Sequence, residues 1–126
     1  MKKILTCLLA VLGLTSACGQ KNYDDVDVAG FASLLSDSSV IVLDVRTAAE
    51  FSDGHVWRAV NIDVKQSGFL DNAKAALHSG KTVAVYCRSG RRSAAACDKL
   101  SGEGYKCVNL KGGILAWTKE GQPVTR

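Results

Sequence analysis

The stretch TVAVYCRSGRRS, residues 82–93, contains an apolar run that changes at Cys87 into a polar, arginine-rich segment. Residues 82–86 are short, apolar and rich in β-branched side chains, a pattern typical of a buried parallel strand. The glycine and arginines of residues 88–92 indicate a tight loop. Alanine-rich residues 93–100 then predict a helix. This order places Cys87 at the carboxyl end of a strand, where sites form in open α/β sheets.

The charge around Cys87 predicts a reactive thiolate. Backbone N–H groups of a tight loop can converge on one point, and the helix that follows adds the partial positive charge of its N-terminus. Arg88, Arg91 and Arg92 make the loop still more positive. A cysteine in such surroundings has a lowered pKa, and its thiolate is a nucleophile that can hold a transferred group covalently. Cys87 is therefore the candidate nucleophile.

The rest of the chain alternates between apolar strands and amphipathic helices. Further helices are expected at residues 28–35, 47–51, 69–77 and 114–119, and further strands at residues 40–43, 59–62 and 106–110. Thr47, with Glu50 three residues later, fits a capping box at the start of the second helix. This alternation predicts a three-layer α/β domain over residues 27–126, with a mainly parallel central sheet and helices on both faces.

Length and charge limit the classes of function. A chain of 126 residues has room for one domain and a short extra segment, and its 47% hydrophobic residues are enough for a core. The formal net charge of +4 includes Lys2 and Lys3, which we expect to be removed. The small remainder and the lack of a long basic stripe argue against a nucleic-acid partner.

The N-terminus resembles a bacterial lipoprotein signal. Two lysines precede the apolar residues 4–14, which are fewer than the about 20 that a spanning helix needs. LTSAC, residues 14–18, resembles a lipobox, although Thr15 stands where Leu is commoner. We expect a signal peptide over residues 1–17, lipid attachment at Cys18 and a tether over residues 18–26. The protein would then be exported to the bacterial cell envelope, face the periplasm and be anchored to a membrane. The alternative is ordinary cleavage after Ala17, which leaves Cys18 free.

Two further cysteines, Cys97 and Cys107, fall on the predicted helix after the loop and on the next strand. Both are expected to be small core residues, with a disulfide between them as the alternative in an oxidising compartment. The sequence has no C-x-x-C pair, so no metal site is expected.

Four motifs in the order of one family carry a resemblance. CRSGRRS, residues 87–93, resembles the active loop of rhodanese-like proteins, written C-x-x-G-x-R-S. The other three are LDVR at residues 43–46, EFSDGHV at 50–56 followed by AVNI at 59–62, and GG at 112–113 followed by Trp117. They resemble the family's D-V-R, E-[FY]-x-x-G-H-I-x-G-A-x-N-I and G-G-x-x-x-W motifs. One departure is Trp57-Arg58, where the family usually has Pro-Gly.

The resemblance implies a sulfurtransferase without organic cofactor or metal. Cys87 would take a sulfane sulfur from a donor such as thiosulfate, hold it as a persulfide, and pass it to cyanide or a thiol; a thiol reductase is a further candidate partner. The implied substrate-binding residues are Arg88, Ser89, Gly90, Arg91, Arg92 and Ser93. The implied supporting residues are Asp44, Arg46, Glu50 and His55.

Two alternatives share the fold. Phosphatases of the Cdc25 type have a C-x5-R loop that wraps a phosphate, whereas the spacing from Cys87 to Arg92 is C-x4-R. A loop one residue shorter suits a single extra sulfur atom better than a tetrahedral oxyanion. A non-catalytic rhodanese-like binding or sulfur-carrier module is the other alternative, but such modules usually lack the cysteine.

Overall fold

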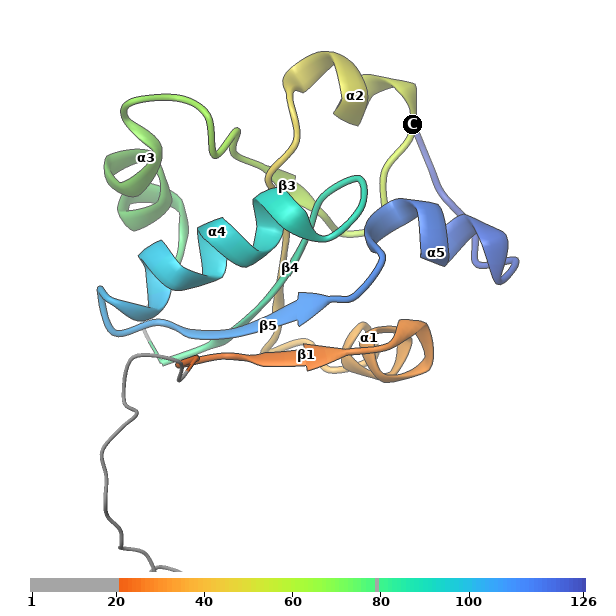
Figure 1. Ribbon diagram of the computed structural model, residues 1–126, viewed down its shortest axis with the longest axis horizontal. Helices are drawn as coiled ribbons and strands as arrows, with labels where there is room; N and C mark the ends of the chain where they lie inside the picture. Colours follow the sequence, from red (N-terminus) through yellow and green to blue (C-terminus); the bar gives the residue numbers. More distant parts are fainter. Residues whose placement is uncertain (1–20, 79) are drawn as a thin grey trace, which may run out of the picture.

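The computed structural model describes residues 21–78 and 80–126 and contains one five-stranded sheet (Figure 1). All neighbouring strands are parallel, in the order β1-β5-β4-β2-β3. The strands are β1 (Asp24–Val26), β2 (Ile41–Asp44), β3 (Val60–Asn61), β4 (Thr82–Tyr86) and β5 (Lys106–Leu110). The helices are α1 (Val28–Leu34), α2 (Ala48–Asp53), α3 (Phe69–Ala76), α4 (Arg91–Ser101) and α5 (Gly113–Lys119).

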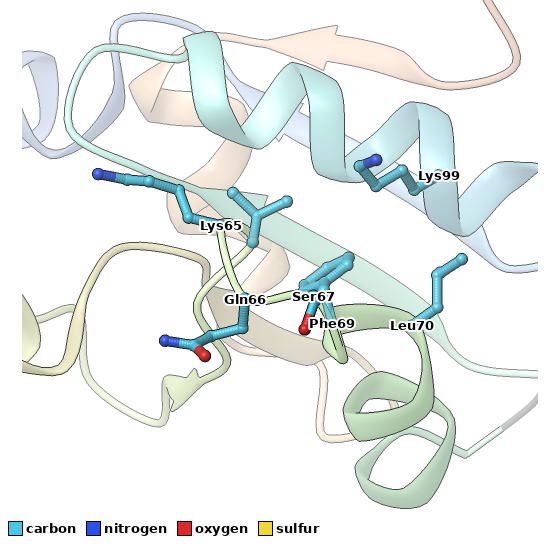
Figure 2. A pocket seen from close by; sticks show the side chains of 7 residues that line it. Lys65, Gln66, Ser67, Phe69, Leu70 and Lys99 are labelled. Atoms are coloured by element: carbon cyan, nitrogen blue, oxygen red, sulfur yellow. The ribbon is translucent and has the colours of Figure 1, made fainter.

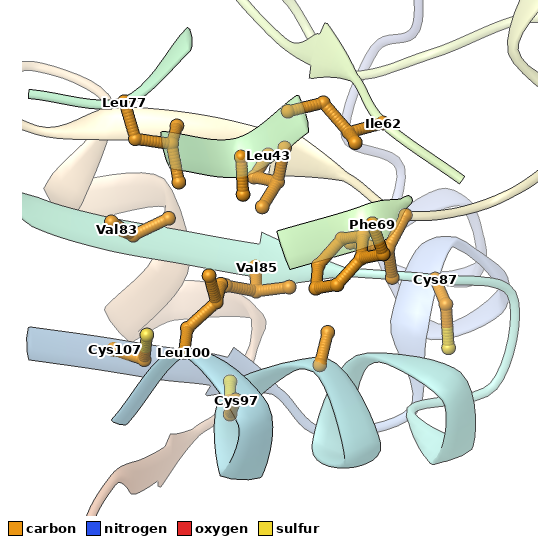
Figure 3. Close-up of a cluster of buried hydrophobic side chains, with 13 residues drawn as sticks. Leu43, Ile62, Phe69, Leu77, Val83, Val85, Cys87, Cys97, Leu100 and Cys107 are labelled. Atoms are coloured by element: carbon orange, nitrogen blue, oxygen red, sulfur yellow. The ribbon is translucent and has the colours of Figure 1, made fainter. Parts of the chain in front are cut away.

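The helices cover both faces of the sheet, as the sequence predicted. Along β4, Val83 and Val85 belong to one buried cluster and Ala84 and Tyr86 to another, because successive side chains of a strand point to opposite faces. Helices α3 and α4 pack on the first face, and α1 and α5 on the second. The first cluster, shown in Figure 3, extends along the sheet to Cys87. The core therefore supports the Cys87 end of β4 from both sides.

The tether expected over residues 18–26 is wrong at its C-terminal end. Asp24–Val26 forms β1, which pairs in parallel with β5 at one edge of the sheet. Two of its three residues are exposed aspartates, so the apolar alternation that marks a buried strand is missing. The expected signal peptide and Cys18 lie outside the described residues. Within residues 21–78 and 80–126, no helix is both long and apolar enough to cross a bilayer.

Arg58 takes the place of the family's usual glycine and keeps the conformation of a glycine. Its φ is +75°, in the left-handed region that favours glycine. Its guanidinium group donates hydrogen bonds to the carbonyl oxygens of Leu35 at 2.8 Å, Asp37 at 3.3 Å and Val40 at 2.7 Å. Arg58 thus ties the turn before β3 to the segment between α1 and β2, and these bonds offset the backbone strain.

We predict that Arg58→Ala is less stable than Arg58→Gly. Both variants lose the three hydrogen bonds, but only alanine keeps the strain of a positive φ, which costs about 1 kcal/mol. Urea denaturation measures the free energy of unfolding of both variants and of the wild type. Equal stability of the two variants would show that the positive φ at this position is not strained.

Candidate active site

Cys87 follows β4 directly and begins the segment that we call the Cys87 loop, residues 87–93. Its side chain is buried, with only 1% of the residue exposed. Figure 3 shows the sulfur pointing toward the first turn of α4. Gly90 precedes α4 with a φ of +103°, so the loop can turn sharply without the clash that a Cβ would cause. The predicted position of the cysteine between strand and helix is therefore confirmed.

Hydrogen-bond donors of the loop converge on the sulfur. The backbone N–H of Gly90 donates to Cys87 Sγ at 3.1 Å, and Ser93 Oγ lies 3.3 Å from it. Burial raises the pKa of Cys87, but hydrogen bonds from the Ser93 hydroxyl and from the backbone of Ser93, Gly90 and Ser89 outweigh it. The pKa of the thiol is therefore lower than its ordinary value, as the sequence analysis expected. Ser93 is itself fully buried, so its hydroxyl faces the sulfur and not the solvent.

The shape of the loop depends on the start of α5. The N–H groups of Ile114 and Leu115 donate to the carbonyl oxygens of Cys87 and Arg88 at 2.9 and 3.1 Å. These carbonyls are thereby held toward α5, so they do not compete for the donors that face the sulfur. At Gly113, whose φ is +59°, a Cβ would lie 2.6 Å from the Cys87 carbonyl oxygen. The close approach explains the second glycine of the GG motif.

Arg92 joins the loop to α2. Its two terminal nitrogens donate to the two carboxylate oxygens of Glu50 at 2.8 and 2.9 Å, a bidentate ion pair. Arg92 lowers the pKa of Glu50 to about 2. Glu50 also completes the capping box with Thr47 at the start of α2. The guanidinium of Arg92, which the resemblance placed among the substrate-binding residues, is therefore already bound to a carboxylate and supports the loop.

The remaining loop arginines lie on the rim of the site. Arg88, Ser89 and Arg91 are exposed, and Gly90 is half-buried. Two exposed guanidinium groups in the loop that holds the thiol would favour the approach of small anions to this end of the sheet. Of the six residues predicted to bind substrate, Gly90 and Ser93 contact the sulfur, and Arg88 and Arg91 are exposed in the same loop.

A buried polar network holds the neighbouring strand end. Asp44, at the end of β2, pairs with Arg46 at 2.6 Å and accepts a hydrogen bond from the Tyr86 hydroxyl at 2.6 Å. Arg46 also donates to the Gly54 carbonyl oxygen at 2.8 Å, and the Tyr86 hydroxyl accepts from Val56 N at 3.0 Å. Burial, followed by the charge of Asp44, raises the pKa of Tyr86 and keeps it neutral. The network connects the end of β2 to the end of β4 and to the segment that follows α2.

Sequence reasoning did not find Tyr86. Its hydroxyl contacts residues that are 42 and 30 positions away in the chain, so no local pattern reveals the contact. One signal could have suggested the contact between Tyr86 and Asp44. Asp44 of the D-V-R motif and Tyr86, directly before Cys87, stand at the ends of two neighbouring strands.

His55 has structural contacts. Its ring stacks on Phe51, with centroids 3.7 Å apart and an interplanar angle of 5°, and its Nδ1 lies 2.9 Å from the Phe51 carbonyl oxygen. Its backbone exchanges two hydrogen bonds of 2.8 Å with Thr125. These contacts fix the C-terminal segment against the end of α2.

The other cysteines of the described segment are core residues. Cys97 and Cys107 are buried and are not joined by a disulfide. The hydrogen bond to Cys107 and burial raise the pKa of Cys97, so this thiol is far less acidic than Cys87. No group of three His, Cys, Asp or Glu side chains in the described part of the chain is placed to hold a metal ion.

The fold and the site define a class: an α/β domain with an acidic thiol in a C-x4-R loop at a strand end. Residues 27–120 match the family model of the rhodanese-like domain, and the chain belongs to this family. A "Sulfurtransferase" of Allochromatium vinosum is 32% identical over 80% of this chain and 94% of its own length. Thiosulfate sulfurtransferase 18 of Arabidopsis thaliana is 36% identical over 88% of this chain and 90% of its own length. The crystal structure of a rhodanese-related protein from Thermoplasma volcanium has a TM-score of 0.73 and 35% identity, covering 82% of this chain and 98% of that one.

We predict that Gly113→Ala disrupts the Cys87 loop. Gly121→Ala is the matched control, because Gly121 also has a positive φ, +82°, but has nothing within 4 Å of the position that a Cβ would take. The control loses about 1 kcal/mol of stability from backbone strain. Gly113→Ala loses at least about 2 kcal/mol more from the clash with the Cys87 and Arg88 carbonyls. Urea denaturation and the rate of Cys87 alkylation measure both effects. Equal stability and equal alkylation rates in the two variants would contradict this role of Gly113.

Proposed function

We propose that this protein is a thiosulfate sulfurtransferase that carries sulfur as a persulfide on Cys87. The observation that carries the proposal is the set of donors around Sγ: Gly90 N at 3.1 Å and Ser93 Oγ at 3.3 Å, in a loop of C-x4-R length. Donors that stabilise a thiolate also stabilise a persulfide anion, so one loop serves both halves of a transfer. The names of the similar sulfurtransferases support the same reaction class.

The reaction has two displacement steps. In the first, the Cys87 thiolate attacks the outer sulfur of thiosulfate; an S–S bond forms to Cys87, the S–S bond of the donor breaks, and sulfite leaves with the electron pair. In the second, cyanide or a thiolate attacks the outer sulfur of the persulfide, and Cys87 leaves as the thiolate. Arg88 and Arg91 on the rim attract the dianionic donor. A thiol acceptor leaves as a persulfide that a thiol reductase would then reduce.

The phosphatase alternative requires a loop that can surround a phosphate. In this loop, Arg92 follows Cys87 after four residues and already pairs with both oxygens of Glu50. A phosphate would have to compete with that carboxylate for the guanidinium group. The short loop and the occupied arginine both favour sulfur transfer over phosphate hydrolysis.

We predict that Cys87 is the one cysteine that loads sulfur. Intact mass after incubation with thiosulfate shows one added sulfur atom in the wild type, in Cys97→Ala and in Cys107→Ala, because neither of those thiols lies in the loop whose donors face Cys87 Sγ. Cys87→Ser keeps the fold, since the swap is nearly isosteric, and loses both loading and thiosulfate:cyanide sulfurtransferase activity. Sulfur loading by Cys87→Ser, or efficient hydrolysis of an aryl phosphate by the wild type, would overturn the proposal.

We propose also that the protein is exported and attached to the membrane through a lipid on Cys18. The lysines, the apolar residues 4–14 and the LTSAC stretch support this location. In a bacterial host, the wild type sediments with membranes and incorporates labelled fatty acid, whereas Cys18→Ala does neither. A soluble wild type whose N-terminus is an unmodified Cys18 would exclude lipidation.

A further inference from the structure

The described chain enters the domain at the end of the sheet that is opposite to Cys87. All neighbouring strands are parallel, so their amino ends share one edge of the sheet, whereas Cys87 follows the carboxyl end of β4. Asp24, the first residue of β1, pairs with Val108, two residues after the start of β5. Figure 1 shows β1 beginning beside the turn between α4 and β5, far from the loop between β4 and α4. We call this region the amino edge; it comprises residues 21–23, the turn at residues 102–105 and Lys106.

Three contacts fix the point at which the chain enters. The Ser101 hydroxyl, at the end of α4, donates a hydrogen bond to the Asn22 carbonyl oxygen at 3.3 Å. Lys21 forms an ion pair with Asp25 of β1, and Tyr23 packs against the first buried cluster. The chain is therefore held against the amino edge as far back as Lys21.

The length of chain between Cys18 and Lys21 limits how the domain can stand on a membrane. Three residues span at most about 10 Å. Helix α4, whose 11 residues begin in the Cys87 loop and end at Ser101, is about 16 Å long. If the Cys87 loop touched a membrane that holds Cys18, Lys21 would stand about 16 Å above its surface, a distance that three residues cannot span.

We propose that the amino edge lies on the phospholipid head groups and that the Cys87 loop points away from the membrane. The inference rests on the proposed lipid at Cys18 and adds to it the surface of the domain that meets the bilayer. Lys106 is exposed on this edge, so its ammonium group is placed to pair with head-group phosphates. The exposed Arg88 and Arg91 then face the aqueous phase, and sulfur donors and acceptors reach Cys87 from water.

Two exposed lysines at opposite ends of β5 form a matched pair for the test. Lys106 is the first residue of the strand and Lys111 follows its last, about 16 Å away along the strand. Lipidated wild-type protein is reconstituted into phosphatidylcholine vesicles that contain a small fraction of a phospholipid whose head group carries an amine-reactive ester. Peptide mass spectrometry then identifies the lysines that have become joined to lipid. A water-soluble ester of the same type, applied to Cys18→Ala, measures the intrinsic reactivity of each lysine.

Lys65 and Lys99 form a second pair on another side of the domain. They line opposite ends of a pocket of about 310 Å³ along α4, with Lys65 toward the Cys87 loop and Lys99 toward the amino edge (Figure 2). A domain that lay on this side would present both lysines equally to the lipid ester. The second pair therefore distinguishes an upright domain from one that lies flat.

After correction for intrinsic reactivity, Lys106 is labelled at least about fivefold more than Lys111, because it lies about 16 Å nearer to the head groups. Lys99 is likewise labelled more than Lys65. Cys18→Ala mixed with the same vesicles shows neither preference, since it has no anchor. Equal labelling within either pair, or a preference for Lys111, would overturn the proposal.

A second preparation separates failure of this orientation from failure of the proposed lipidation. The chain from Cys18 onward, which contains every described residue, carries Cys87→Ser and is coupled through the Cys18 thiol to a maleimide phospholipid in the same vesicles. Its remaining cysteines are buried and do not compete for the maleimide. Preference for Lys106 supports the orientation even if the wild type carries no lipid in the cell. Equal labelling of Lys106 and Lys111 overturns the orientation even if the wild type is lipidated.

Discussion

The hydrogen bonds that α5 donates to the carbonyls of Cys87 and Arg88 are the constraint on which the site depends. A loop of this length has as many acceptors as donors, and a carbonyl turned toward Sγ would repel a thiolate. Ile114 N and Leu115 N donate hydrogen bonds to these two carbonyl oxygens at 2.9 and 3.1 Å, so both carbonyls are engaged by α5. The N–H of Gly90 and the hydroxyl of Ser93 can then face Sγ. The low pKa of the Cys87 thiol therefore depends on the packing of the Cys87 loop against the start of α5, two segments that are distant in the sequence.

Some charged side chains of the site hold its elements together, and others are exposed to solvent. Arg92 and Glu50, in a bidentate pair, connect α4 to α2, and the pKa of Glu50 at about 2 keeps the pair ionised at any physiological pH. Asp44, Arg46 and Tyr86 form a second, buried support. Arg88 and Arg91 remain exposed and have room to meet a ligand. Because the supporting charges are paired within the protein, the positive field at the rim comes from the exposed arginines.

The sequence predicts the fold well because the central strands are uniformly apolar. Residues 82–86 and 106–110 match the observed β4 and β5, and the capping box of Thr47 and Glu50 is present. Edge strand β1 escapes prediction, because its exposed aspartates carry no apolar pattern. The predicted start of helix α4 is two residues late, since the arginines at 91 and 92 resemble loop residues.

The candidate site is less predictable than the fold. Cys87 and its acidity follow from local sequence, because a strand, a tight loop and a helix are contiguous. The contacts of Arg92 with Glu50 and of Tyr86 with Asp44 each join residues that are 42 positions apart. The resemblance therefore assigns Arg92 to the substrate without revealing its carboxylate partner, and no local pattern reveals the contact of Tyr86.

The central claim, that loop donors lower the pKa of the Cys87 thiol, is tested most directly by the pH dependence of its alkylation. Because the donors lower the pKa of Cys87, the rate in the wild type reaches half of its plateau below the ordinary thiol value of about 8.5. Ser93→Ala removes one donor to the anion and raises that midpoint by about one pH unit. A wild-type midpoint at or above about 8.5, or a midpoint that Ser93→Ala leaves unchanged, would contradict the account.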